Sequence, residues 1–342
     1  MTGVDGGGVV AEEAARSSSV LVRVACGVSL AALAPWMAEA SWGGYPVTYY
    51  PTLVLFGATF YGMAALIIRE VSRRWSGGWP AIILLAAAFG VIQAGVVDQS
   101  LFNVDYLDDT QFDATQSEAA RTSVPVIGVS LSQVLDYVGN HIALSIAAPI
   151  ALVEAFAPPA YRDRPWLSRG ALVAMAPVYL LGSAMIFLDD DGRKGFTAAP
   201  GQLAGALVIA AVVITLARLP RWRRSPAALP GRVPAPLVVG LVALIPFFNS
   251  LSSNWTGQLL RIAVWIAFVI AVLRYSRRAG WSRRHTLAVW SAGLVSVAAS
   301  VLAVPTYFPV PPSIALLSDI IVMALAATLI SVGFWRLRQR PA

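Results

Sequence analysis

The chain alternates long apolar blocks with short polar segments. Ten blocks approach the length of about 20 residues that a helix needs to cross a bilayer. They cover residues 20–40, 50–68, 79–98, 133–157, 168–188, 199–217, 234–249, 255–273, 286–303 and 313–335. The seventh block is the shortest and carries Pro234, Pro236 and Pro246. The pattern predicts an all-α, polytopic membrane helix bundle with about ten transmembrane helices.

The segments outside the blocks are polar. Residues 1–19 are rich in Gly, Ala and Ser without an apolar period, which predicts a disordered tail. Residues 20–335 then form the transmembrane domain, and residues 336–342 form a basic tail. The loop at 103–132 is acidic and longer than most connections in compact proteins, so we expect either a functional lid or local disorder.

Basic residues predict the orientation, because Lys and Arg are retained on the cytoplasmic side. With ten spans, 21 basic residues fall on one side and three, Arg121, Arg193 and Lys194, on the other. Both termini are therefore expected in the cytoplasm, and the acidic loop outside. A signal peptide cleaved after Ala40, which would leave nine spans and an external start, remains open.

Composition narrows the class of protein. Apolar residues make up 57% of the chain and charged residues 13%, which excludes a soluble domain. The net charge of +7 comes from Arg clusters between apolar blocks, so the expected partner is a lipid bilayer, the bacterial cytoplasmic membrane, and not nucleic acid. One cysteine and two histidines leave little for a metal site, and no cofactor is expected. Lys194, the only lysine, lies in a loop and cannot form a Schiff base inside the bundle.

Polar residues at membrane depth are candidate site residues, because ionisable groups inside a span are costly and tend to face a bundle interior. The candidates are Gln93, Asp98, Gln99, Asn103, Asp136, Tyr137, Asn140, His141, Arg261 and Asp319. With the predicted topology, nearly all of them lie toward the external side. We therefore expect an outward-facing polar pocket built by the third, fourth, eighth and tenth spans, with Arg261 opposite Asp319 or Asp136.

Within the fourth span, Tyr137, His141 and Ser145 recur every four residues and share one side of the helix. Such groups bind a ligand or proton, or else hydrogen-bond neighbouring helices as structural glue. For His141 both roles, and the rarer one of metal ligand, remain open. Three glutamates at span ends are attributed to interfacial solvation, and Gly201 with Gly205 predicts close helix packing. These glutamates are Glu39, Glu70 and Glu154.

Several of these segments resemble known membrane proteins. The stretches are Gln93-Ala94, residues 99–103 (QSLFN), Asn140-His141 and residues 145–154 (SIAAPIALVE). They resemble a group of uncharacterised actinobacterial multi-pass membrane proteins and, more distantly, the CPBP (CAAX protease and bacteriocin-processing, or Abi) family. That family places paired glutamates on one helix and an aromatic-x-x-x-His motif on a later one, where they activate water for peptide hydrolysis.

This resemblance implies a shared helical fold and argues against an intact hydrolase. Tyr137 and His141 match the second motif, with Tyr in place of Phe. Gln93 and Ala94 stand where the glutamate pair belongs, and glutamine cannot act as a general base. A functional transfer from the family would thus depend on His141 alone.

Three functions stay open. The favoured one is a permease or solute-binding protein that takes a small molecule or peptide at its external face. The second is a CPBP-like intramembrane hydrolase or inactive relative, with Asp98 or Asp136 replacing the lost glutamates beside His141. The third is a non-catalytic membrane scaffold or sensor. A carboxylate in hydrogen-bond reach of His141 would favour hydrolysis, and a dry interior with every polar group paired would favour the scaffold.

Overall fold

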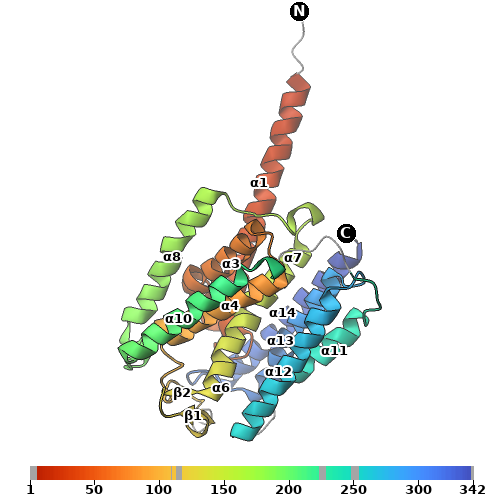
Figure 1. The fold of residues 1–342 in the computed structure, drawn as a ribbon. Helices are drawn as coiled ribbons and strands as arrows, with labels where there is room; N and C mark the ends of the chain where they lie inside the picture. The colour runs from red at the N-terminus through yellow and green to blue at the C-terminus, as the bar shows by residue number, and fades with distance from the viewer. Residues whose placement is uncertain (1–5, 109, 113–117, 223–228, 248–253, 340–342) are drawn as a thin grey trace, which may run out of the picture.

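The protein is an integral multi-pass membrane protein with an all-α fold. The computed structural model describes residues 6–108, 110–112, 118–222, 229–247 and 254–339 (Figure 1). The chain is 76% helical. Within the described residues, nine helical segments are long and apolar enough to cross a membrane. The predicted all-α membrane helix bundle is therefore confirmed.

The helices follow one another along the chain with short connections. The first group is α1 (Gly6–Pro35), α2 (Tyr50–Gly57), α3 (Met63–Arg74), α4 (Trp79–Ile92), α6 (Leu131–Gln133), α7 (Ala148–Phe156), α8 (Arg169–Leu188), α9 (Asp190–Arg193) and α10 (Pro200–Ala217). The second group is α11 (Pro236–Phe247), α12 (Trp255–Ser276), α13 (Arg283–Ser300) and α14 (Pro312–Gln339). Within the acidic loop, β1 (Ser123–Val124) pairs antiparallel with β2 (Val129–Ser130). The Val124–Leu131 stretch is thus mostly a small hairpin.

Five π-helical segments interrupt the first four spans. They are η1 (Trp36–Ala40), η3 (Ala58–Gly62), η4 (Gln93–Val97), η5 (Val134–Val138) and η6 (His141–Ala147). The structure also has four short 3₁₀ segments, η2 (Val47–Tyr49), η7 (Pro159–Tyr161), η8 (Pro220–Trp222) and η9 (Val301–Ala303). A π-helical turn holds one residue more than an α-helical turn and is often found at functional sites. All the described π-helical turns lie in the N-terminal part of the bundle.

The seventh predicted span appears as α11, of which 12 residues are described. It starts at Pro236, as proline favours the first helical turn, and its described part runs to Phe247. The last residues of the predicted block lie outside the described residues. Nine helices therefore qualify as spans by length, and α11 packs along α13 as a shorter apolar helix.

Both predicted tails are helical where the structure describes them. Helix α1 runs from Gly6 and projects from the bundle, so residues 6–19 are helical (Figure 1). Alanine and glutamate, which are frequent from residue 11 to 16, have high helix propensity. Helix α14 continues to Gln339, so most of the basic tail is its last turn. Residues 1–5 and 340–342 lie outside the described residues.

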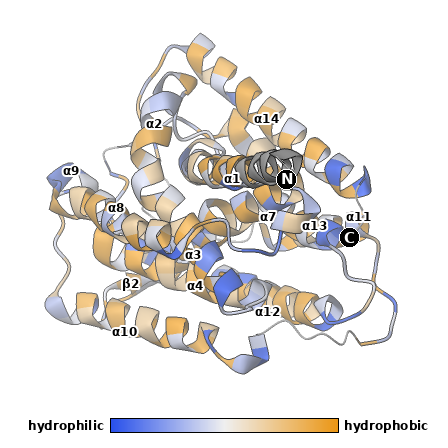
Figure 2. Ribbon diagram, turned by 90° about the horizontal axis from the view of Figure 1, so that it is seen from above, coloured by the Kyte–Doolittle hydropathy of each residue, from blue (hydrophilic) through white to orange (hydrophobic). Residues whose placement is uncertain are grey.

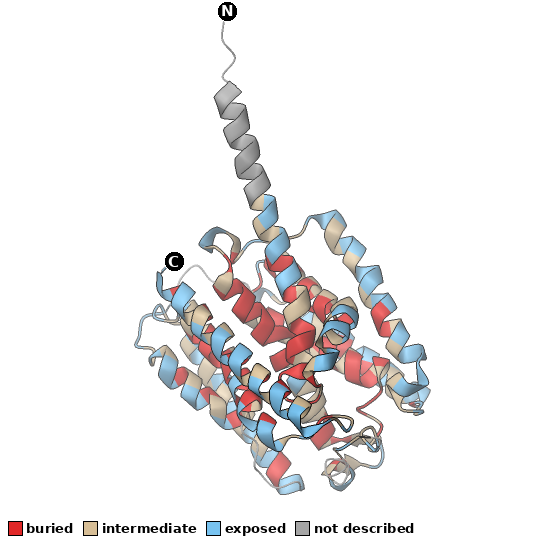
Figure 3. Cartoon of the chain, turned by 180° about the vertical axis from the view of Figure 1, so that it is seen from behind, coloured by how far each residue is buried: buried red, intermediate tan, exposed pale blue. Residues whose placement is uncertain are grey.

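One continuous helical segment, Leu131–Phe156, forms the centre of the bundle. It includes α6, η5, η6 and α7, and 72% of its most apolar window is buried, the largest share of any span. It packs on α1 and α4 on one side and on α13 and α14 on the other. The buried residues gather in the middle of the bundle (Figure 3), and the peripheral helices are built mostly of hydrophobic residues (Figure 2), many of which are exposed. Helices α8, α10 and α12 are under one-fifth buried and supply surface for lipid.

The arginine-bearing connections meet at one end of the bundle, here called the arginine-rich end. The Gly78 N–H donates to the Trp222 carbonyl at 2.9 Å, which joins the α3–α4 turn to the end of α10. The Leu229 N–H donates to the Arg277 carbonyl at 2.9 Å, which joins the start of α11 to the end of α12. The structure thereby brings together the basic segments that the sequence assigned to one side. That this side is cytoplasmic stays a prediction.

Candidate functional site

A cavity of about 260 Å³ lies at the opposite end, beneath the acidic loop. Its wall comes from the end of the first span, the acidic loop, the fourth span and the α13–α14 loop, through Ala38, Glu39, Trp42, Val104, Leu107, Phe112, Glu118, Ala119, Ser132, Gln133, Asp136, Tyr137, Asn140, His141, Ser145 and Tyr307. Asn140 is exposed, whereas His141 and Ser145 are buried. The wall thus combines exposed and buried polar residues, and the buried His141 and Ser145 are here called the floor of the cavity.

Three of the π-helical segments line this cavity. Segments η1, η5 and η6 contribute Glu39, Asp136 and His141 to its wall. Tyr61 of η3 lies behind Glu39, to which its hydroxyl donates. A wide turn changes the direction in which the following side chains point, which allows Asp136 and Asn140 to reach the same space as Tyr137 and His141. The sequence gives no periodic signal for these turns.

The carboxylates of the wall have polar partners. Asp136 Oδ1 accepts from Arg261 Nη2 at 2.7 Å, although 45% of the Asp136 side chain is exposed. Glu118 Oε1 accepts from Gln258 Nε2 at 2.7 Å. Burial raises the pKa of the Glu118 carboxyl and nearby Asp136 adds to this, while Arg261 acts in the opposite direction. Both contacts attach α12 to the mouth of the cavity.

At the floor, His141 Nδ1 lies 3.1 Å from the Ser145 hydroxyl, one turn further along the helix. The His141 ring also contacts the rings of Tyr61 and Phe89, at centroid distances of 5.7 and 5.4 Å. Among the described residues, no carboxylate is hydrogen-bonded to this imidazole. His141 is therefore buried between aromatic rings and a hydroxyl, without the acidic partner that a general base would use.

Aromatic rings form the upper part of the wall. Trp42 packs edge-on against Phe112 and Tyr307, at centroid distances of 5.4 and 5.2 Å. The ring centroids of Tyr137 and of Tyr106, in the acidic loop, lie 6.0 Å apart. The Tyr307 N–H donates to the Gly44 carbonyl at 2.9 Å, which holds the α13–α14 loop against the end of the first span. These contacts hold three segments, far apart in sequence, around one space.

The structure brings together about half of the predicted site residues. Asp136, Tyr137, Asn140 and His141 all line the cavity, and Arg261 reaches it through Asp136. Asn103, another predicted site residue, contacts the cavity-lining Gln133. Its carbonyl oxygen accepts from Gln133 Nε2 at 2.7 Å, and its side chain accepts from the Asp105 N–H. Asn103 thus anchors the loop to the fourth span.

The other predicted residues lie elsewhere. Gln93 is buried behind the wall and hydrogen-bonds Asp98. Asp98 follows the third span, accepts from the Ser100 N–H at 2.9 Å, and has its pKa raised to about 7 by burial. Gln99, at a positive φ of 60°, accepts from the Ala198 N–H at 2.6 Å. These three residues form the turn after α4 and are absent from the cavity wall.

Asp319 is the clearest misplacement among the predicted site residues. It lies on α14, where its charge acts on Tyr50, and Arg261 pairs with Asp136 instead. The third, eighth and tenth spans were expected to form the wall, but none of their residues lines it. The position of a polar residue along its span could be predicted from the sequence. The neighbouring helix that its side chain faces could not.

The sequence reasoning missed the contribution of the first span. Glu39 and Trp42 line the cavity, and Met37 beside them is completely buried. Glu39 is half-buried in the cavity wall and accepts a hydrogen bond from Tyr61, so interfacial solvation alone does not explain it. The sequence did contain a signal for Glu39, because it is an ionisable residue near the end of an apolar block. The same criterion selected Asp98 and Asp136.

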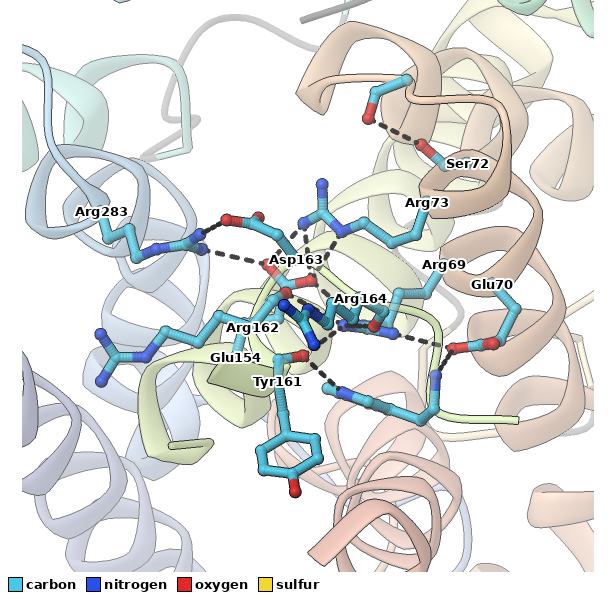
Figure 4. Close-up of polar contacts among 12 residues, drawn as sticks. Arg69, Glu70, Ser72, Arg73, Glu154, Tyr161, Arg162, Asp163, Arg164 and Arg283 are labelled. Atoms are coloured by element: carbon cyan, nitrogen blue, oxygen red, sulfur yellow. Dashed lines mark hydrogen bonds and ion pairs between the residues drawn. The ribbon is translucent and has the colours of Figure 1, made fainter. Parts of the chain in front are cut away.

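Interfacial solvation was wrong for Glu154, which lies in a buried group of charges at the arginine-rich end. Glu154 is 3% exposed and faces three guanidinium groups (Figure 4). It accepts from Arg73 Nη2 at 2.6 Å and from Arg69 Nε at 3.1 Å, and Arg283 Nη1 lies 3.8 Å away. Arg283 also pairs with Asp163. This charge cluster joins α3, α7, α13 and the α7–α8 loop.

Glu70 belongs to the same cluster and is also buried. Its carboxylate accepts from Arg69 Nη1 at 2.8 Å and from the Trp166 and Leu167 backbone N–H groups at 2.8 and 3.1 Å. The Arg69 guanidinium lies 3.3 Å from the centroid of the Trp166 ring and donates to carbonyls of the α7–α8 loop. Every charge in the centre of the cluster thus has an opposite charge or a backbone partner, as burial requires.

The pair formed by Asp136 and Arg261 offers a test of the wall. Because the carboxylate is nearly half exposed, their coupling energy in a double-mutant cycle is expected to be about 0.2–1 kcal/mol. The cycle combines Asp136→Asn and Arg261→Gln, with the free energy of unfolding measured in mixed micelles. A coupling energy above about 3 kcal/mol, typical of a fully buried pair, would contradict the described geometry.

Comparison with protein-family models, with curated proteins and with solved structures found no match to this chain. One helical segment joins the cavity to the charge cluster. Glu154 follows His141 by 13 positions on it, which corresponds to about 20 Å at 1.5 Å per residue.

Proposed function

We propose that the protein binds a small solute in this cavity, as a permease or a solute-binding membrane protein. The observation that carries the proposal is a cavity of about 260 Å³ whose wall is polar at membrane depth. Binding sites are concave, few per protein, and combine apolar surface with a small number of placed polar groups. Here Trp42, Phe112 and Tyr307 supply the apolar surface, and the fourth span supplies the polar groups.

The rest of the bundle fits such a role. At the opposite end, the charge cluster around Glu154 closes the path along the fourth span. A solute that crosses the membrane by this route requires the contacts of Glu154 with Arg69 and Arg73 to separate. A permease would therefore alternate between this state, open beneath the acidic loop, and a second state open at the arginine-rich end. A solute-binding protein would keep the cluster closed.

The geometry supports the alternatives less. A hydrolase of the CPBP type needs a carboxylate beside His141 or at residues 93 and 94, and His141 instead contacts Ser145. A purely structural scaffold is expected to have a dry interior with its polar groups paired. Gln133, which lines the cavity, has a buried oxygen without a partner among the described residues. The predicted likeness to the CPBP family stays a prediction about shared fold.

A ligand screen tests the proposed function. In detergent, a solute that binds the cavity is expected to raise the melting temperature of the wild-type protein, because a ligand that binds only the folded state stabilises it. His141→Ala alters the floor of the cavity and is expected to lose this shift while its unliganded melting curve stays cooperative. A broad solute library that gives no shift, or shifts equal in both proteins, would contradict the proposal.

A further inference from the structure

We propose that the cavity binds an organic ammonium ion; this inference rests on the proposed function and specifies its ligand. The charges of the wall are the first observation. Glu39, Glu118 and Asp136 contribute carboxylates, and none of the described wall residues is a lysine or an arginine. Arg261 pairs with Asp136 without lining the cavity, and Arg261 and Arg121 both act on Glu118. The wall itself therefore carries three carboxylates and no guanidinium or ammonium group.

Gln133 is an independent second observation. It lines the cavity, it is 6% exposed, and its Oε1 atom has no hydrogen-bond partner among the described residues. Its Nε2 atom donates to the Asn103 carbonyl at 2.7 Å. A carbonyl oxygen only accepts, so this contact fixes the orientation of the amide and leaves Oε1 as an acceptor. A buried acceptor without a partner is costly, and a ligand N–H group would satisfy it.

Gln258 repeats the arrangement at the mouth. Its Nε2 atom donates to Glu118, which fixes the amide, and its buried Oε1 atom lacks a partner within the described chain. Gln258, like Arg261, does not line the cavity, so the wall itself offers the Gln133 acceptor together with the three carboxylates. A ligand that matches these groups carries several N–H donors and a positive charge.

The aromatic wall favours an organic cation over a metal ion. Trp42, Phe112, Tyr137 and Tyr307 line the cavity, and aromatic faces attract organic cations through their quadrupole. Within the described residues, no three His, Cys, Asp or Glu side chains are grouped so that they could hold a metal ion. An alkyl or aryl group on the ammonium would contact the rings while its N–H groups face the acceptors.

The surroundings of Arg261 favour a different ligand, an anion. Its Nε and Nη1 atoms are buried without partners in the described part of the chain, so they could receive an anion. Arg261 does not line the cavity, however, and its remaining nitrogen is paired with Asp136. The acceptors on the wall therefore decide the assignment, and an anionic probe tests the alternative.

Three probes of similar shape test the charge of the ligand. These are phenethylammonium, neutral 2-phenylethanol and anionic 3-phenylpropanoate, each titrated into the full-length protein in detergent at pH 7 by calorimetry. The ammonium probe is expected to bind more tightly than the other two. Preferential binding of the neutral or anionic probe would overturn the ammonium assignment while leaving the cavity as a solute site.

Substitutions of wall residues test whether the ammonium probe binds in this cavity. Gln133→Leu is expected to lower the affinity for the ammonium probe by about tenfold to a hundredfold, as when a hydrogen bond between a charged and a neutral group is lost. Glu118→Gln is expected to weaken it less and to leave the neutral probe unchanged. The control Gln339→Leu, at an exposed position at the far end of α14, is expected to bind like the wild type.

Equal affinity of the Gln133→Leu variant and the wild type for the ammonium probe, with both proteins folded by circular dichroism, would overturn the assignment. Displacement of the probe by millimolar Ca²⁺ that depends on Glu118 would also overturn it, because the acceptors would then form a metal site. If none of the probes binds, the ammonium assignment fails, and the broad solute screen decides separately whether the cavity is a binding site.

Discussion

Replacing Glu154 by glutamine is expected to lower the free energy of unfolding by about 3–5 kcal/mol, the usual cost of removing one partner of a buried ion pair. Glu154 is the carboxylate shared by Arg69 and Arg73, both of which are buried. The neutral amide keeps the shape but leaves two guanidinium groups facing each other with less compensation. The loss is measured by unfolding in mixed micelles of increasing sodium dodecyl sulfate fraction.

An exposed ion pair provides the matched control. Asp190 pairs with Arg193 at 2.9 Å, but its side chain is 88% exposed. Asp190→Asn is therefore expected to change the free energy of unfolding by less than about 1 kcal/mol. Equal effects of the two substitutions would show that Glu154 is solvated and not buried.

A charge-balanced variant separates loss of the carboxylate from loss of packing. Replacing Glu154 and Arg73 together by leucine removes one charge of each sign, and well-packed apolar side chains often replace a buried ion pair without loss of stability. We expect the double variant to be more stable than Glu154→Leu alone. If the two leucine substitutions were simply additive, the charge cluster would not act as a unit.

The second large effect is expected at Gly62, where η3 packs against α1. A Cβ atom at this position would lie 2.5 Å from the Ala31 carbonyl oxygen and 2.9 Å from the Ala31 Cα atom. Both are backbone atoms, so the two helices would have to move apart. Gly62→Ala is expected to lower the free energy of unfolding by about 1–3 kcal/mol, as overpacking does in a close-packed interior.

Gly205→Ala is the control for Gly62. The sequence predicted close packing at Gly201 and Gly205, but no atom lies within 4 Å of a Cβ atom built at either position in the described protein. Alanine is the better helix former, so Gly205→Ala is expected to be neutral or stabilising by up to about 1 kcal/mol. A loss at Gly205 as large as that at Gly62 would place α10 against another surface.

The bundle was predictable because hydropathy and the arginine clusters depend on local composition. Each span needs a long apolar segment regardless of its neighbours, and the predicted blocks coincide with the observed helices within a few residues at most ends. That residues 6–19 are helical was not predictable from hydropathy. It depends on helix propensity at residues such as Glu12 and Glu13.

The candidate site was predicted only in part because it depends on contacts between distant segments. Tyr137, His141 and Ser145, which share one side of the fourth span, line one cavity. The positions of Glu39 and Glu70 did not follow from helical periodicity. Glu39 approaches the cavity from the first span, and the Glu70 carboxylate accepts from the Trp166 N–H, 96 residues along the chain.

The low hydropathy of the central span also bears on how the protein is assembled during synthesis. Leu131–Phe156 has the lowest mean hydropathy of the nine spans, 1.4, and is the most buried. As an isolated helix in the bilayer, it would thus be the least stable of the nine spans, since its polar groups would lack partners there. Helices α1, α3 and α4, which contact it, precede it in the chain and leave the ribosome first. They offer the nascent span a prepared polar surface, including the arginines for Glu154, and α13 and α14 cover its other side when translation is nearly complete.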